Sequence, residues 1–293
     1  MRDYIGKTIR DLRIGKGMTL RELSSNLMST SQLSNIESGS QIPSTEKFLI
    51  LLNRLNVKYD EFILLMENDY LKKKTLIERE LAEAVKLKNL KKLRDLSFKA
   101  KNLNEKYRDI YFYHVELISL SVLHLLKNNN DYTGARIYLD PIKEYLIQIE
   151  EWTYYELALI CNCIFMFDIE SAVLLGERAL TFIEKKYCFY RNEEISCVLL
   201  NNLATYSLDF ETYYPLALKY SQVSSNLSST NNLSSSSIRA KIIYQIACYK
   251  LQNGQYQPGY LESLINIFKL LGWNDEYYSI CKFVNKHGIS IKK

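Results

Sequence analysis

The sequence is poor in the residues that interrupt helices. Only 4 of its 293 residues are proline and only 10 are glycine. Leucine, isoleucine, lysine, glutamate and tyrosine are frequent, and no stretch beyond residue 75 alternates apolar and polar residues as a strand would. Because proline and glycine are the least favourable residues in a helix interior, their scarcity predicts an all-α protein.

The residue patterns of enzymes and metal proteins are also missing. The 3 histidines are scattered, and the sequence contains no glycine-rich phosphate loop, nucleophile elbow or cluster of metal ligands. None of the 6 cysteines forms the Cys-x-x-Cys pair of a zinc site. We therefore expect no enzymatic activity, no metal and no cofactor. The cysteines are interpreted as buried thiols that pack as small apolar side chains, with a redox or metal role as the alternative.

Long apolar runs are absent too. No run reaches the length of a membrane span, and the N-terminus lacks a signal-peptide core, so we expect a cytoplasmic protein with no membrane partner. Charge is unevenly distributed: the net charge is +2 over residues 1–66, +5 over residues 67–107 and −2 over residues 108–293. A basic N-terminal part joined to a larger, slightly acidic part is typical of a DNA-binding head on a sensor body.

The stretch 19–43 carries the clearest local signal. Two helix starts lie ten residues apart, and each has a capping box, formed by Thr19 with Glu22 and by Ser29 with Gln32. The second helix is small and polar on its outer face. Two short helices joined by a tight turn in this way are what a helix-turn-helix needs to enter a major groove of DNA.

Apolar periodicity around this stretch defines a first domain. It predicts further helices over residues 3–13, 45–55 and 59–66, so that five helices form a bundle over residues 1–66. Residues 67–74 are assigned as a linker, because their basic end lacks an apolar stripe; that end is either linker or the start of the next helix.

Residues 75–293 are predicted to form a second, repetitive domain. Four stretches share an apolar helix, a short polar turn and a second helix with a small residue near its start. Those small residues, 37, 45 and 42 positions apart, are Ala135, Ala172, Ala217 and Gly259. Such a period is the signature of stacked helical hairpins, so we expect a right-handed solenoid of tetratricopeptide-like units. The run 224–237, rich in Ser and Asn, is interpreted as a helix end followed by a loop.

Several polar residues of the first domain are candidate DNA contacts. Leu33 and Ile36 must face the core, which leaves a polar outer face on the second short helix: Thr30, Ser31, Gln32, Ser34 and Asn35. Glutamine and asparagine amides suit adenine, whereas hydroxyls at a helix N-terminus suit phosphate. Candidate phosphate contacts elsewhere in the domain are Lys7, Arg13, Arg21, Gln41 and Lys47. For each residue, solvated surface is the alternative.

Three asparagines stand out in the repeat domain. Asn162, Asn201 and Asn202 each lie inside an apolar helix, where asparagine is unfavourable unless its amide finds a partner. A side-chain amide both donates and accepts, so it can hold the backbone of a bound peptide; an inter-helix hydrogen bond in the core is the alternative. Aromatic residues that either line a peptide groove or pack in the core are Tyr154, Tyr155, Phe165, Tyr206 and Tyr244.

The pattern from Leu23 through Ser31-Gln-Leu-Ser-Asn-Ile-Glu-Ser-Gly39 resembles the XRE, or λ-repressor-like, DNA-binding domain. Followed by a helical-repeat body, the whole chain is similar to the Rgg/GadR/MutR regulators of low-GC Gram-positive bacteria. These belong to a wider group of peptide-sensing regulators that includes PlcR and ComR. The N-terminal likeness rests on specific residues, and the C-terminal likeness rests on length, order and repeat style.

The resemblance implies a quorum-sensing transcription regulator. It would bind promoter double-stranded DNA as a homodimer and take a short hydrophobic signalling peptide, or pheromone, on the concave face of its repeats. It also implies that Arg10 pairs with Glu37 to fix the recognition helix. Two positions depart from the family pattern: Asn35 stands where a basic residue is common, and Lys58 is a poor N-cap. The alternatives are a peptide-independent regulator whose repeats serve as a dimerisation frame, and a protein-binding repeat adaptor.

Overall fold

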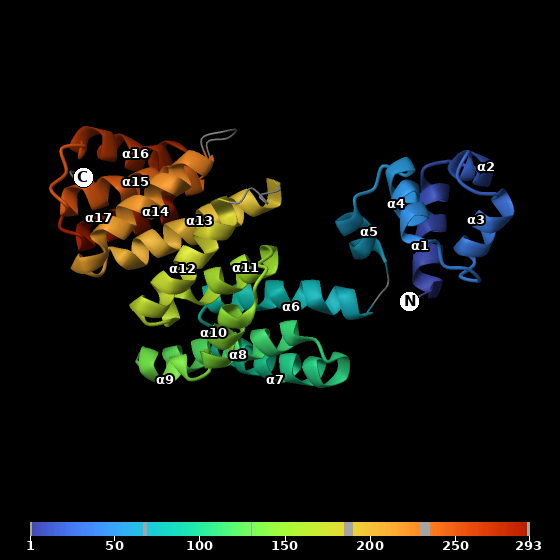
Figure 1. Ribbon diagram of the computed structural model, residues 1–293, viewed down its shortest axis with the longest axis horizontal. Helices are drawn as coiled ribbons and strands as arrows, with labels where there is room; N and C mark the ends of the chain where they lie inside the picture. Colours follow the sequence, from blue (N-terminus) through green and yellow to red (C-terminus); the bar gives the residue numbers. More distant parts are fainter. Residues whose placement is uncertain (1, 67–68, 130, 185–189, 229–234, 292–293) are drawn as a thin grey trace. The chain divides into compact units, whose positions relative to one another are not determined.

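The computed structural model describes residues 2–66, 69–129, 131–184, 190–228 and 235–291. Every regular element in these residues is a helix, as the low proline and glycine content predicts (Figure 1). The chain divides into two compact units, residues 1–127 and residues 128–293, and each unit is described by itself.

The first unit begins with the helix-turn-helix bundle and continues with three longer helices. Its helices are α1 (Arg2–Gly15), α2 (Leu20–Ser24), α3 (Thr30–Glu37), α4 (Thr45–Arg54), α5 (Tyr59–Leu65), α6 (Asp69–Lys86), α7 (Leu90–Tyr107) and α8 (Ile110–Lys127). The five helices predicted for residues 1–66 are all present, and the three with predicted ranges, 3–13, 45–55 and 59–66, have bounds within two residues of those expected.

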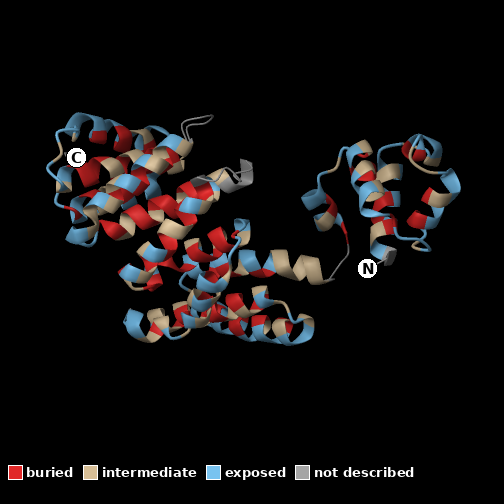
Figure 2. Ribbon diagram, viewed as in Figure 1, coloured by how far each residue is buried: buried red, intermediate tan, exposed pale blue. Residues whose placement is uncertain are grey.

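The bundle α1–α5 encloses one apolar core. Its buried members come from all five helices (Figure 2). They include Ile9, Leu23, Leu33, Leu51 and Phe62, each with no exposed surface. Full burial of one such side chain stabilises a fold by about 1.5–3 kcal/mol. The core therefore holds the two short helices α2 and α3, which are too short to be stable alone.

Polar caps set where the short helices begin. Glu22 N–H donates to Thr19 Oγ1 at 3.2 Å, and Thr19 N–H donates to Glu22 Oε2 at 2.7 Å, which completes the first predicted capping box. Gly39, with φ of +79°, turns the chain after α3, a conformation that favours glycine. At α5 the Lys58 side chain offers no acceptor, and the Glu61 carboxylate accepts from the Lys58 N–H at 2.8 Å instead.

The helix α6 begins at Asp69, so residues 69–74 of the assigned linker are helical. The other two residues of that linker, 67–68, lie outside the described residues. Polar contacts join this start to α8. Tyr70 Oη donates to Asp109 Oδ2 at 2.5 Å, and Lys74 Nζ lies 2.9 Å from the same oxygen. The hydrogen bond to Asp109 raises the pKa of Tyr70 to about 12.

The second unit consists of helical hairpins. Its helices are α9 (Tyr132–Arg136), α10 (Asp140–Gln148), α11 (Tyr154–Cys163), η1 (Ile164–Met166), α12 (Ile169–Glu184), α13 (Tyr190–Ser207), η2 (Glu211–Tyr213), α14 (Tyr214–Ser228), α15 (Ser235–Lys250), α16 (Pro258–Leu270) and α17 (Asn274–Lys286). α13 packs against α11, α14 and α15, as expected of stacked repeats. Within the predicted loop 224–237, residues 229–234 lie outside the described residues.

The small residues that revealed the repeat have two different environments. Ala135, Ala172 and Ala217 are fully buried, so each allows two helices to approach closely. Gly259 is exposed, and a Cβ atom there would meet no heavy atom within 4 Å. Close helix packing therefore explains the small residue at the three alanine positions. It does not explain Gly259, which follows Pro258 at the start of α16.

The described cysteines are free thiols. Cys163, Cys197 and Cys248 are buried, and Cys161 and Cys281 are half-buried. Burial raises the pKa of the Cys161 thiol to about 11, which keeps it protonated and unreactive near neutral pH. The sixth cysteine, Cys188, lies outside the described residues.

Candidate DNA-binding face and ligand cavity

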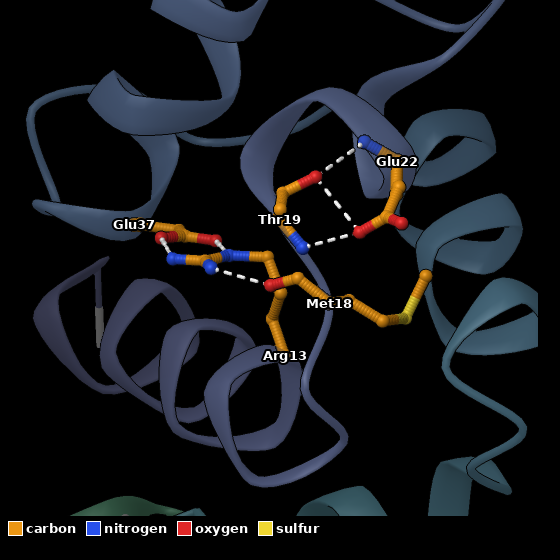
Figure 3. Close-up of polar contacts among 5 residues, drawn as sticks. All are labelled: Arg13, Met18, Thr19, Glu22 and Glu37. Carbon is orange, nitrogen blue, oxygen red and sulfur yellow. Dashed lines mark hydrogen bonds and ion pairs between the residues drawn. The ribbon is translucent and has the colours of Figure 1, made fainter.

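An ion pair between α1 and α3 fixes the end of the recognition helix. Arg13 Nε lies 2.7 Å from Glu37 Oε1 and Arg13 Nη2 lies 2.8 Å from Glu37 Oε2, while Nη1 donates to the Met18 carbonyl oxygen at 2.8 Å (Figure 3). The two side chains are 11% and 6% exposed. The hydrogen bond to Glu37 raises the pKa of Arg13. The guanidinium therefore joins α1, α3 and the segment before α2.

This pair corrects one prediction, while a phosphate contact by Arg13 stays a prediction. The arginine of α1 that meets Glu37 is Arg13, whereas Arg10 is exposed, so Arg10 is not the structural partner. The reason is helical spacing. Arg13 lies four residues after the buried Ile9 and shares its face, whereas Arg10 follows Ile9 directly and points about 100° away.

The outer face of α3 is polar and accessible. Leu33 and Ile36 are fully buried, as predicted, and the exposed residues of the helix are Thr30, Ser31, Ser34 and Asn35. The backbone oxygen of Asn35 accepts from Ser38 Oγ and from the Gln41 N–H. These bonds hold the helix end in place, and the residue itself is exposed. Its contact with a base stays a prediction.

Gln32 differs from the sequence expectation. Ser29 Oγ accepts from the Gln32 N–H at 3.1 Å, which is half of the second predicted capping box. The side chain of Gln32 does not return to the cap; its Oε1 accepts from Lys47 Nζ at 3.3 Å. A long cation at the start of α4 thus competes for the amide oxygen. The amide oxygen keeps a second lone pair and the amide nitrogen keeps its donors, so a contact between Gln32 and adenine stays a prediction.

The other candidate phosphate contacts differ in exposure. Lys7, Arg21 and Gln41 are exposed and Lys47 is half-buried. Their role in DNA binding stays a prediction.

A cavity of about 580 Å³ lies in the second unit, between α13, α15 and α17. Volumes of this size are typical of ligand sites. Three helices line it at helical spacing, with Val198, Asn201, Asn202 and Thr205 from α13, Ser235, Ser236, Arg239, Ile242 and Ile243 from α15, and Glu276, Ser279, Ile280 and Phe283 from α17, preceded by Trp273. Two of the three predicted asparagines are therefore in one cavity wall.

The two asparagines in this wall have different roles. Asn201 is 6% exposed, and its Nδ2 donates to the Ser236 carbonyl oxygen at 2.9 Å, so it joins α13 to α15. Its Oδ1 is buried without a hydrogen-bond partner among the described residues. Asn202 is half-buried, and its Nδ2 is 3.4 Å from both the carbonyl oxygen and Sγ of Cys161. Asn201 thus fits the core alternative, and Asn202 is the more accessible amide.

The remaining predicted peptide contacts lie outside the lining of this cavity. Asn162 is exposed on α11. Phe165 stacks edge-on against Tyr206, whose Oη donates to the Phe167 carbonyl oxygen at 2.8 Å. Tyr244 Oη contacts Gln255 Oε1. Tyr154 and Tyr155 begin α11, where Tyr155 packs against Tyr145. The structure does not gather these residues around the cavity.

Sequence reasoning missed most of the cavity wall. Arg239, Glu276 and Phe283 were not singled out, although Ser236, Arg239 and Ile243 repeat at three- and four-residue intervals on one helical face. The helix α15 carries apolar residues on several faces, so no single polar stripe marked this one. Across the described part of the chain, no group of residues is arranged to hold a metal ion and no helix is long and apolar enough to cross a membrane.

Comparisons with known proteins agree with this architecture. Residues 90–281 match the family described as HTH-type transcriptional regulator Rgg, C-terminal domain, and residues 9–62 match the helix-turn-helix family. The first match alone covers more than half of the chain.

Three solved structures share the fold. A cysteine-to-serine variant of the SHP pheromone receptor Rgg2 of Streptococcus dysgalactiae is 22% identical with a TM-score of 0.78, covering 97% of this chain and 99% of its own. A putative transcriptional regulator from Listeria monocytogenes EGD-e is 21% identical with a TM-score of 0.78, covering 99% and 100%. PlcR of Bacillus thuringiensis, in complex with the peptide PapR7 and DNA, is 18% identical with a TM-score of 0.70, covering 95% and 99%. With its helix-turn-helix head and matching repeat body, the chain belongs to the Rgg family of helix-turn-helix transcriptional regulators.

Proposed function

We propose that the protein is a sequence-specific transcriptional regulator whose operator binding is controlled by a short linear peptide, as in quorum sensing. The peptide would bind in the cavity between α13, α15 and α17. The observation that carries this proposal is one cavity of about 580 Å³ in which asparagine amides lie beside apolar and aromatic side chains. The descriptions of Rgg2 as a pheromone receptor and of PlcR with a peptide and DNA support it.

The chemistry of the wall suits an extended peptide. Burying a peptide N–H or C=O without a partner costs about 1–3 kcal/mol, so the site must offer both donors and acceptors. The half-buried amide of Asn202 does so, and its only contacts among the described residues are the long ones to Cys161. Ile242, Ile280 and Phe283 supply apolar surface for peptide side chains.

The same proposal includes a homodimer. One helix-turn-helix covers too few base pairs for useful specificity, and two-fold symmetry places two copies on two half-sites. The end of the second unit exposes large apolar side chains, among them Leu270 at 85% and Tyr278 at 69%. Exposed apolar surface of this kind marks interaction sites, which supports dimerisation through the C-terminal repeats.

Replacing Asn35 with alanine is expected to weaken operator binding by about 1–3 kcal/mol, because a base-reading amide discriminates by that amount. The operator is defined as the duplex that the full-length protein selects from random DNA. Gel-shift titrations compare this duplex with a random one, on which little loss is expected. Asn53→Ala, an exposed asparagine on α4, is the matched control. An equal loss on both duplexes would show that Asn35 does not read a base.

Replacing Asn202 with alanine is expected to weaken peptide binding by roughly tenfold, since one lost hydrogen bond to a buried peptide group corresponds to about 1–2 kcal/mol. The probe is the tightest-binding member of a synthetic library of eight-residue hydrophobic peptides, selected on the wild-type protein and titrated by calorimetry. Asn266→Ala, an exposed asparagine on α16, is the control.

Two results would count against the proposed function or its site. If Asn202→Ala lowers the melting temperature by several degrees and leaves peptide affinity alone, Asn202 is a core hydrogen-bonder and the groove lies elsewhere. If no library peptide changes operator affinity, the chain is a peptide-independent regulator whose repeats serve as a frame. Asn162→Ala measures whether the groove extends to α11.

A further inference from the structure

The cavity between α13, α15 and α17 has a polar end and an apolar end. Ser235, Ser236 and Arg239 line it along the first turns of α15, whereas Ile242 and Ile243 line it one turn further along. On α17, Glu276 and Ser279 come before Ile280 and Phe283, and Trp273 lines the cavity just before the helix. The charged residues of the lining therefore lie near the beginning of both helices, beside Trp273, and the aliphatic residues follow.

Two contacts fix how these helices are aligned. Asn201 donates to the carbonyl oxygen of Ser236 in the first turn of α15. Tyr249 Oη, near the end of α15, donates to the Gly288 carbonyl oxygen just beyond α17 at 3.3 Å. At 1.5 Å per residue, Arg239 lies about 15 Å before Tyr249 along α15. By the same rise, Glu276 lies about 18 Å before Gly288 along α17. They therefore lie at nearly the same level on two walls of the cavity.

These two opposite charges do not pair with each other. Among the described residues, Arg239 and Glu276 make no ion pair or side-chain hydrogen bond, and both are exposed. A guanidinium offers five N–H donors in a planar fork that matches a carboxylate. The hydroxyls of Ser235 and Ser236 add donors at the same end.

We propose that this end of the cavity is a carboxylate subsite, in which Arg239 binds one negatively charged carboxylate of the peptide while the apolar end holds the adjoining hydrophobic side chains. The inference rests on the proposed function and specifies its ligand. Two sources share this chemistry, the free C-terminus of the peptide and an aspartate or glutamate side chain. Glu276, across the cavity, repels a second carboxylate, so we expect a single acidic group at this site.

Asn201 acts as a positioning residue for this subsite. Its bond to the Ser236 carbonyl oxygen anchors the first turn of α15. Arg239 lies three residues after Ser236 and thus on the same side of the helix. The anchored turn therefore determines where the guanidinium stands, without Asn201 touching the ligand.

The test uses three short probes on the full-length protein, titrated by calorimetry or ligand-observed NMR. They are N-acetyl-Ile-Leu as the free acid, the same dipeptide as its C-terminal amide, and N-acetyl-Asp-Ile-Leu amide. The neutral amide is expected to bind at least tenfold more weakly than one of the two acidic probes, and the identity of the tighter acid distinguishes a terminal from a side-chain carboxylate. Arg239→Met, which keeps the aliphatic stem, should abolish the difference. Glu276→Gln should tighten the acidic probes.

The control is Lys241→Met, which removes a cation from the same helix at a position outside the cavity lining, and it should leave the preference unchanged. Equal binding of acidic and neutral probes, no binding of any probe up to millimolar concentration, or an unchanged preference in Arg239→Met would each overturn the carboxylate subsite. The proposed function stands or falls separately, on whether library peptides alter operator affinity. A library peptide that acts while the acids show no preference would refute only the subsite.

Discussion

Arg13→Ala is expected to lower the free energy of unfolding of the helix-turn-helix bundle by about 3–5 kcal/mol, because removing one partner of a buried ion pair leaves the other charge uncompensated. Glu37, 6% exposed, would lose both of its contacts to the guanidinium. The Met18 carbonyl oxygen would lose its donor as well. Such a cost is a large fraction of the stability of a small domain, so the recognition helix should open far more often.

The measurement is hydrogen exchange followed by mass spectrometry on the full-length protein, read on peptides that cover α2 to α4. Both tryptophans, Trp152 and Trp273, lie in the second unit. Their fluorescence therefore shows whether that unit is unchanged. Arg10→Ala is the matched control, since Arg10 is an exposed arginine of the same helix and should change stability by less than about 0.5 kcal/mol. Similar exchange rates in the Arg13 and Arg10 variants would contradict the structural role of the pair.

Arg13 also illustrates what the sequence could and could not predict. Composition, capping residues and apolar periodicity are local properties, and they sufficed for the helix-turn-helix and its five helices. The existence of an arginine–glutamate pair followed from the resemblance. Helical spacing places Arg13, and not Arg10, on the face of the apolar residue Ile9. That this face meets Glu37 depends on how α1 packs against α3.

The side chain of Gln32 does not complete the predicted capping box, and the reason is related. A capping box can be recognised from Ser29 and Gln32 alone, because their spacing is local. Lys47, fifteen residues later, takes the amide oxygen only once α4 has packed beside α3. A local sequence pattern such as the capping box therefore cannot predict a hydrogen bond from a distant residue such as Lys47.

In the repeat domain, too, the sequence pattern identified some residues of the cavity and missed those that depend on how the helices pack. Two of the interior asparagines lie in the α13 wall of the cavity, and both amides have partners, as expected of an unfavourable residue in an apolar helix. Of the three asparagines singled out from the sequence, the cavity lining includes only Asn201 and Asn202. The other two walls are formed by α15 and α17. The sequence does not show which of their polar and apolar residues face the cavity, because that depends on how the helices stack.

Gly6→Ala is expected to destabilise the bundle by about 2–3 kcal/mol, although alanine is the better helix former by about 1 kcal/mol. A Cβ atom at Gly6 would lie 2.1 Å from the Ile36 carbonyl oxygen and 3.0 Å from that of Glu37. Both atoms belong to the backbone of α3, and the Ile36 oxygen also accepts from the Gly39 N–H. It cannot move without disturbing the end of the recognition helix, so α1 and α3 must separate, and overpacking of this kind costs about 1–3 kcal/mol or more.

The control lies in the same helix. A Cβ atom at Gly15 would meet no heavy atom within 4 Å, so Gly15→Ala should leave stability unchanged or raise it by about 0.4–1 kcal/mol through the unfolded chain. Hydrogen exchange over α1 and α3 compares the two variants, and gel shifts on the selected operator show whether the displaced recognition helix also loses affinity. Because Asn35 precedes Ile36, separating α1 from α3 should move this proposed base-reading residue along with the helix. If Gly6→Ala proved as stable as Gly15→Ala, α1 and α3 would not be in the close contact that holds the recognition helix in position.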